Sequence, residues 1–280
     1  MISLPENPGP IGVFDSGYGG LTILHGLRQL LPPSDYMYLG DNARAPYGTR
    51  SFDVVYQFTR QAVIKLFEMG CHLVILGCNT ASAKALRSIQ QRDLCGLDPE
   101  RRVLGVIRPT AEIIGKLTRN NHVGLFATEG TVRSHSYDLE VKKFWPETKI
   151  TGVACPFWVP LVEYNEADSP GADYFVKKRV DELMQKDPDI DTIILGCTHY
   201  PILMPKIKKY VNPDIKIVPQ GEYVAGSLKD YLERHPDMER KCTKTGSCRY
   251  FTTENPNKFK ESARIFLHED VDVQHIDLGE

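Results

Sequence analysis

The sequence predicts an α/β fold made of two similar three-layer α/β domains with mostly parallel sheets. Short apolar runs alternate with helix-like segments, which is typical of parallel α/β layers. Several runs, such as "LVIL" and "IIL", are continuously apolar, as expected for strands buried on both faces of a sheet. Two stretches are near copies of each other, "LVILGCNTASA" at 73–83 and "TIILGCTHYPIL" at 192–203. The repeat indicates two α/β units that each end one strand in Gly-Cys.

The apolar runs give the expected strands in order along the chain. They lie at residues 11–14, 36–40, 72–77, 102–107, 122–127, 149–154, 192–196 and 215–218. Residues 51–69 have apolar side chains at helical spacing, with Ser51 as an N-cap and Gly70 just past the end, and therefore predict a helix. Further on, "RYFTT" at 249–253 predicts a short strand, and a helix capped near Asn255 follows it.

The repeat also suggests where the domains begin and end. We expect a first domain of residues 1–105 plus about 215–280 and a second domain of residues 106–214. The last segment is assigned to the first domain because terminal strands commonly add to an existing sheet. The site is expected in the cleft between the two domains.

Composition excludes several classes of protein. The chain has 280 residues, of which 41% are hydrophobic and 25% charged, as in soluble globular proteins. With 34 basic and 36 acidic residues the net charge is −2, which gives no attraction to nucleic acid or to an anionic membrane. No stretch approaches the ~18 apolar residues of a membrane span, and the first residues do not resemble a signal peptide. We expect a cytoplasmic protein that binds neither nucleic acid nor membrane.

The cysteines are expected to be free thiols. There are seven, an odd number, and none is arranged as Cys-x-x-Cys. Cys78 and Cys197 differ from the rest because each follows a strand, at the sheet edge where ligands of open α/β proteins collect. If the two domains face each other, these thiols lie on opposite sides of one ligand, as needed to move a proton across a stereocentre. The alternative is that both are small core residues.

Polar side chains surround these two cysteines. Asn79 and Thr80 follow Cys78, and Thr198 and His199 follow Cys197. Short polar chains of this kind can bind an ammonium group and a carboxylate, and His199 can orient or reprotonate the neighbouring thiol. A thiol becomes a plausible base if its pKa falls from about 8.5.

Two further strand ends carry candidate residues. "GVFDSGYGG" places Asp15 and Ser16 before a glycine-rich turn, where backbone can approach a ligand closely. A dinucleotide site is excluded by spacing, since Thr22 occupies the place of the third glycine. The turn of Pro46, Tyr47 and Gly48 also follows a strand, although taken alone it predicts only a surface turn.

Taken together, these motifs resemble those of the glutamate racemases, cofactor-independent enzymes that make D-glutamate for bacterial peptidoglycan. The resemblance covers about residues 10–230. It is carried by "IGVFDSGYGGLTIL", "YLGDNARAPYGTRS", "LVILGCNTASA", "VGLFATEGTVRSHSY", "CPFWVPLVE" and "LGCTHYPIL", in this order.

The resemblance implies roles for individual residues. Cys78 and Cys197 match the two acid/base cysteines, the first associated with the α-proton of the D-enantiomer and the second with that of the L-enantiomer. Glu163 resembles an assisting carboxylate, and Thr131 a hydroxyl on the substrate side. The positions matching substrate-binding or assisting residues are Asp15, Ser16, Pro46, Tyr47, Gly48, Asn79, Thr80, Thr198 and His199.

The resemblance also implies glutamate as the small-molecule substrate, no cofactor, no metal and a homodimer. The sequence departs from the family pattern in two places, with Thr110 where members commonly have glycine and "VPQGEYVAG" in place of a more usual acidic-Ser sequence. The sequence shows no long N-terminal extension of the kind found in members that a cell-wall precursor activates, so we expect no such activation.

Three other functions compete with this one. A racemase of aspartate or of a hydantoin would use the same pair of cysteines with a different pocket. A metal site could use Cys197, His199 and another cysteine, although paired ligand clusters are absent from the sequence. A non-catalytic amino-acid binding protein would use both thiols only for packing.

Overall fold

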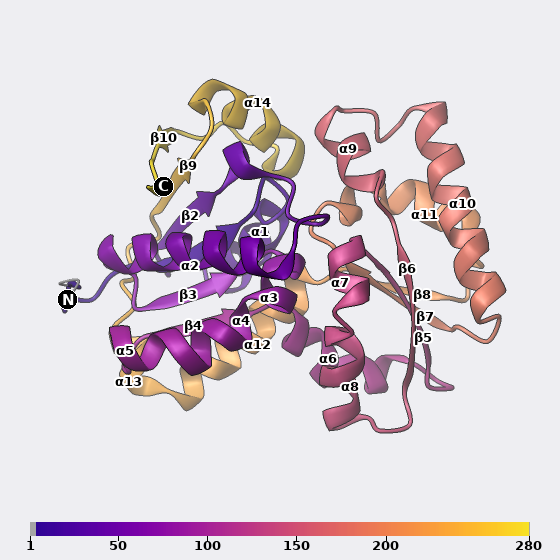
Figure 1. Cartoon of the computed structure of the whole chain (residues 1–280), viewed down its shortest axis with the longest axis horizontal. Coiled ribbons are helices and arrows are strands. Elements are labelled where there is room, and N and C mark those ends of the chain that lie inside the picture. The colour runs from indigo at the N-terminus through magenta and orange to yellow at the C-terminus, as the bar shows by residue number, and fades with distance from the viewer. Residues whose placement is uncertain (1–3, 280) are drawn as a thin grey trace.

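The computed structural model describes residues 4–279, which form two parallel β-sheets that lie side by side (Figure 1). The larger sheet has the strand order β10-β9-β2-β1-β3-β4, and the smaller one β6-β5-β7-β8. The strands of the larger sheet are β1 (Ile11–Asp15), β2 (Tyr36–Gly40), β3 (Leu73–Leu76), β4 (Arg102–Gly105), β9 (Cys248–Thr252) and β10 (Val273–His275). Those of the smaller sheet are β5 (His122–Ala127), β6 (Lys149–Ala154), β7 (Thr192–Gly196) and β8 (Lys216–Val218).

We call each sheet with its helices a unit, the first unit having the six-stranded sheet and the second unit the four-stranded one. The first unit contains α1 (Leu21–Leu30), η1 (Asn42–Arg44), α2 (Phe52–Glu68), α3 (Asn79–Lys84), α4 (Leu86–Ser88), η2 (Ile89–Asp93), α5 (Leu94–Leu97), α12 (Gly221–Arg234), α13 (Pro236–Arg240) and α14 (Pro256–Leu267). The second unit contains α6 (Ile107–Leu117), α7 (Glu129–Arg133), α8 (Ser136–Phe144), α9 (Trp158–Glu163), α10 (Pro170–Lys186), η3 (Tyr200–Leu203) and α11 (Met204–Tyr210). The α/β fold with parallel sheets is the one that the sequence predicted.

The two sheets share one strand order. The arrangement β2-β1-β3-β4 of the first unit recurs as β6-β5-β7-β8 in the second, and every pairing between these strands is parallel. Strands β3 and β7 therefore occupy equivalent positions. The near-copied sequences are the same strand of two similarly wound units, which explains why each one ends in Gly-Cys.

The residues that the sequence predicted at helix ends do lie at helix ends in the structure. Ser51 caps helix α2 by accepting a hydrogen bond from the backbone N–H of Val54 at 3.4 Å. Gly70 follows that helix with φ +99°, a conformation that only glycine adopts readily. Asn255 caps α14 by accepting from the backbone N–H of Asn257 at 2.8 Å.

The end of the chain returns to the first unit. Strand β9 pairs with β2, and helix α12 packs against α1 so closely that a Cβ on Gly26 would lie 2.8 Å from the backbone of Gly221. Strand β8 pairs with β7, so the chain leaves the second sheet after Val218, slightly beyond the boundary at 214 drawn from the sequence. Its apolar run does not reveal which sheet it joins. In the described residues, no helix has the length and apolar character needed to cross a membrane.

Candidate active site

The carboxyl ends of four central strands meet at the junction between the units. Asp15 ends β1, Cys78 follows β3, Thr128 follows β5 and Cys197 follows β7. In each sheet these two strands are the neighbours at which the winding direction changes, the place where open α/β sheets bind ligands. Cys78 and Cys197 are each only 6% exposed. The repeated Gly-Cys motifs therefore bring two buried thiols to the same junction.

Cys78 is the N-cap of helix α3. Its sulfur accepts a hydrogen bond from the backbone N–H of Ala81 at 3.4 Å and lies 3.3 Å from the hydroxyl oxygen of Ser16. Burial raises the pKa of the Cys78 thiol to about 12, and the charge of Asp15 adds to this rise, which the two hydrogen bonds only partly offset. At neutral pH Cys78 is a protonated thiol.

Cys197 is linked to an imidazole and a carboxylate. His199 Nδ1 lies 3.9 Å from Cys197 Sγ, and His199 Nε2 lies 3.0 Å from Glu163 Oε1. Burial disfavours the charged form of His199, but its hydrogen bonds to Cys197 and Glu163 outweigh that effect and raise its pKa to about 10. His199 is therefore a cation at neutral pH.

Asp15 is a buried carboxylate with an unused oxygen. Its Oδ2 accepts from the backbone N–H of Gly17 at 2.9 Å, but Oδ1 has no hydrogen-bond partner among residues 4–279, although Asp15 is 1% exposed. Burial raises the pKa of Asp15 to about 6, against the opposing effects of His199 and of the backbone N–H groups of Gly17 and Gly20. An unpaired buried oxygen is costly, so this one suits a cationic group of a ligand.

The glycine-rich turn after β1 forms the contact with the second unit. A Cβ on Gly19 would lie 2.2 Å from Thr198 Oγ1 and 2.4 Å from His199 Nδ1. Thr22, two residues after the turn, donates from its hydroxyl to the main-chain oxygen of Thr198 at 3.1 Å. Gly19 is needed because a side chain at this position would collide with the turn that follows β7.

Three threonine hydroxyls from both units lie together at the junction between the units. Thr80 Oγ1 is 2.9 Å from Thr128 Oγ1 and 3.5 Å from Thr131 Oγ1, and the last two are 3.1 Å apart. Sequence reasoning identified Thr80 and Thr131 but missed Thr128. Its place directly after a strand, as the N-cap of α7, is the signal that could have found it.

The Pro-Tyr-Gly turn is placed at the edge of the site. The hydroxyl of Tyr47 donates to Asp41, so it is engaged within the first unit, and Pro46 is exposed. The main-chain oxygen of Gly48 accepts from the backbone N–H of Gly130 at 2.8 Å. This turn therefore contacts helix α7 of the second unit through its backbone.

Both polar atoms of the Asn79 side chain are bonded to other residues of the protein. Its Nδ2 donates to Gln220 at 2.6 Å and its Oδ1 accepts from Tyr137 at 2.7 Å. Gln220 in turn lies 3.1 Å from the hydroxyl of Thr110. The two places where the sequence departs from the family pattern are thus in contact with each other. Neither Gln220 nor Tyr137 was predicted from the sequence.

Two other features lie outside this site. A cavity of about 720 Å³ is lined mainly by residues of α4, α6, α8 and α12 and contains none of the predicted site residues.

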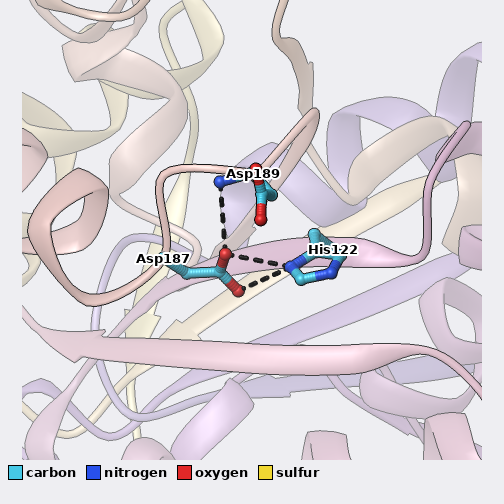
Figure 2. Close-up of side chains that lie close together, drawn as sticks. All are labelled: His122, Asp187 and Asp189. Atoms are coloured by element: carbon cyan, nitrogen blue, oxygen red, sulfur yellow. Dashed lines mark hydrogen bonds and ion pairs between the residues drawn. The ribbon is translucent and has the colours of Figure 1, made fainter.

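His122, Asp187 and Asp189 have potential ligand atoms within 4.8 Å of one another (Figure 2). His122 Nδ1 is 2.9 Å from the carboxylate of Asp187, and Lys149 Nζ is 3.0 Å from it. The positive charge of Lys149 therefore balances the negative charge of Asp187. This cluster joins the start of β5 and β6 to the end of α10.

Comparison with known proteins defines the class of protein. The model of the Asp/Glu/Hydantoin racemase family matches residues 21–221. The glutamate racemase of Ruegeria pomeroyi is 40% identical over 271 residues, which are 93% of this chain and 97% of that protein. The chain therefore belongs to the Asp/Glu/hydantoin racemase family and is an isomerase, as the motifs suggested.

Solved structures agree with this assignment. The crystal structure of a glutamate racemase isoform from Bacillus anthracis has a TM-score of 0.86 at 33% identity and covers 96% of this chain and 98% of that one. The glutamate racemase of Francisella tularensis, solved in complex with D-glutamate, has a TM-score of 0.85 at 31% identity, with 97% and 98% covered. The similarity thus extends over both units.

Proposed function

We propose that this enzyme interconverts L-glutamate and D-glutamate without a cofactor, using Cys78 and Cys197 as the two acid/base groups. The observation that carries the proposal is the pair of buried thiols at equivalent strand ends of two similarly wound units. The choice of glutamate is supported by the similarity to glutamate racemases, one of which was solved with D-glutamate.

The charges of the site suit an amino acid. On this proposal, the substrate ammonium pairs with the unpartnered Oδ1 of Asp15, which is buried and has no other cation bonded to it in the described chain. The hydroxyls of Thr80, Thr128 and Thr131 donate to the substrate carboxylate. Oriented donors in a site closed to water stabilise the negative charge that develops there when the α-proton leaves.

The proton transfers use the two sulfurs in turn as base and acid. Starting from L-glutamate, the thiolate of Cys197 takes the α-proton, so that the C–H bond breaks, an S–H bond forms and the electron pair spreads onto the carboxylate. The thiol of Cys78 then gives its proton to the opposite face of the carbon, which forms D-glutamate and leaves Cys78 as the thiolate. From D-glutamate, the same steps run in reverse order.

The two cysteines are prepared for this direction by different surroundings. His199 Nδ1 lies 3.9 Å from the Cys197 sulfur, whereas burial raises the pKa of the Cys78 thiol to about 12 and keeps its proton in place. On this proposal, the enzyme form with a thiolate at Cys197 and a thiol at Cys78 accepts the L-enantiomer. After each turnover to D-glutamate, proton exchange restores this form.

The proposal is tested by racemisation in D₂O. We expect each enantiomer to give product that carries deuterium at the α-carbon, and we expect Cys78→Ser and Cys197→Ser each to lower kcat by ~10³-fold or more. Cys71→Ser, a change in the buried core of the first unit, and Cys95→Ser, a change at an exposed site, serve as controls that keep kcat. Wild-type rates in either active-site variant would disprove the two-thiol mechanism.

Substrate choice needs its own experiment. A panel of enantiopure amino acids with a hydantoin, followed by circular dichroism, is expected to show turnover of glutamate well above that of aspartate. Faster turnover of another compound would identify this chain as a racemase of that compound and leave the two-thiol mechanism standing.

The cellular role follows from the product. We propose that the enzyme works in the cytoplasm, where its D-glutamate supplies peptidoglycan synthesis. We also propose that its domains are the two units, with the return to the first domain after Val218. A homodimer is expected from the family resemblance, and light scattering on the purified protein measures it.

A further inference from the structure

A closed ring of three side-chain hydrogen bonds lies beside the candidate site. Gln220 Nε2 donates to Tyr137 Oη at 2.7 Å, Tyr137 Oη donates to Asn79 Oδ1 at 2.7 Å, and Asn79 Nδ2 donates to Gln220 Oε1 at 2.6 Å. All three side chains are buried, with Gln220 3%, Tyr137 1% and Asn79 2% exposed. Because each side chain both donates and accepts, the three bonds polarise and strengthen one another.

The surroundings fix the direction of the ring. Gln220 Nε2 also lies 3.1 Å from the main-chain oxygen of Val106 and 3.1 Å from Thr110 Oγ1. If the amide were turned over, its oxygen would face the carbonyl oxygen of Val106 and its nitrogen would face the amide nitrogen of Asn79. Both contacts would leave buried polar groups unpaired, which is costly. Gln220 therefore has one favourable orientation, and so does Asn79.

The ring joins the helix of Cys78 to the second unit. Asn79 is the first residue of α3, Tyr137 lies in α8, and Gln220 is the N-cap of α12, where the chain crosses back to the first unit. Asn79 is the next residue after Cys78, so a fixed Asn79 also fixes the backbone on one side of the thiol. The backbone N–H of Ala81 then holds the sulfur itself at 3.4 Å.

We propose that Gln220 is a positioning residue for the racemisation: through Asn79 it holds the Cys78 thiol in line with the α-carbon of the substrate. This inference rests on the proposed function. Within residues 4–279, Gln220 forms no hydrogen bond with Cys78. It therefore acts on the thiol only through Asn79. The ring needs side chains from both units, and it is complete only when the units are docked as in this structure.

The test begins with Gln220→Met, which keeps the length of the side chain and removes its donor and its acceptor. We expect kcat to fall by ~10²-fold in both directions, because a thiol displaced by about 1 Å loses its alignment, while KM changes by less than ~3-fold. Gln90→Met is the matched control. Gln90 Nε2 donates to the main-chain oxygen of Val103 at 2.7 Å, outside the ring, so this variant should keep kcat.

A double-mutant cycle separates positioning from simple stability. Tyr137→Phe breaks the same ring at another bond, so the variant carrying both Tyr137→Phe and Gln220→Met should lose no more kcat than the more impaired single variant. If the two losses multiply, the residues act independently and the ring is not the functional unit. If both variants unfold at lower temperature but the folded protein keeps its kcat, the positioning role is disproved.

Gln220→Glu gives a second measurement that also applies if Gln220→Met does not fold. A protonated glutamic acid can donate and accept like the amide, and burial raises the pKa of the new carboxyl. We expect kcat, relative to wild type at the same pH, to rise as the pH falls. A ratio that does not change with pH would overturn the proposal. Failure of the wild-type enzyme to racemise glutamate would instead disprove the proposed function.

Discussion

The close approach of Gly19 to the second unit can be tested with one added methyl group. In Gly19→Ala the new Cβ would lie 2.2 Å from Thr198 Oγ1 and 2.4 Å from His199 Nδ1, whereas ordinary contacts begin at 3.4 Å. Both neighbours are 5% exposed and have little room. His199 or the turn must therefore move by about 1 Å, and such a displacement in a catalytic site lowers kcat by ~10²-fold. The overpacking should also cost about 1–3 kcal/mol of stability.

The assay is the change in circular dichroism of an L-glutamate solution, with urea unfolding measured on the same protein. Gly226→Ala in α12 is the control, since a Cβ there meets nothing within 4 Å. That variant should gain about 0.5–1 kcal/mol and keep its kcat. If Gly19→Ala keeps kcat within ~3-fold of wild type, the turn does not hold His199 in place.

Three further predictions concern charges. Glu163→Gln removes the carboxylate that helps raise the pKa of His199 to about 10, so the alkaline fall in kcat should begin at lower pH; an unchanged pH–rate profile would contradict this. Arg101→Met should cost about 3 kcal/mol or more in urea unfolding, because the fully buried guanidinium donates to three main-chain oxygens, while the folded protein keeps its kcat. Burial disfavours the charge of Asp35, yet hydrogen bonds from the 243–247 loop hold its pKa below the usual 3.8. The stability that Asp35 contributes is therefore present above pH 3.8 and lost as the pH falls, and acid unfolding of Asp35→Asn should show a shallower fall.

His199 gives the opposite dependence on pH. Its pKa rises from 6.5 to about 10 on folding, so its contribution to stability is complete below pH 6.5 and is lost as the pH rises through 10. Urea unfolding of His199→Gln and wild type across this range measures the difference. Parallel stability curves for the two proteins would show that His199 is not protonated in the folded state.

The sequence predicted the parts of the fold that depend on local pattern. Strand β3 is continuously apolar because both its faces are buried, and helix α2 has its cap and its terminal glycine beside it in the chain. Strand β10 escaped prediction because Val273 is its one buried residue and its other two are exposed. Strand β8 was recognised, but its sheet was not, since pairing partners distant in sequence leave no local signal.

The candidate site was predicted to the extent that it repeats. Cys78 and Cys197 were selected as candidates because the same strand ending occurs twice, which one motif alone would not have shown. The ring of hydrogen bonds was missed because its members are 58, 83 and 141 residues apart, and each one alone is an ordinary polar residue. Contacts of this kind depend on how the units dock, and a residue's neighbours in the chain do not encode that.

The shared strand order of the two units comes with unequal surroundings for their sulfurs, since His199 stands beside Cys197 and has no counterpart beside Cys78 in the described chain. Mirror-image molecules have equal free energy in water, so the Haldane relation requires the same kcat/KM for both enantiomers. The imidazole can therefore make turnover of one enantiomer faster only if that enantiomer also has a proportionately higher KM. An enzyme whose two cysteines have different surroundings therefore still brings any starting mixture of the enantiomers to a racemate.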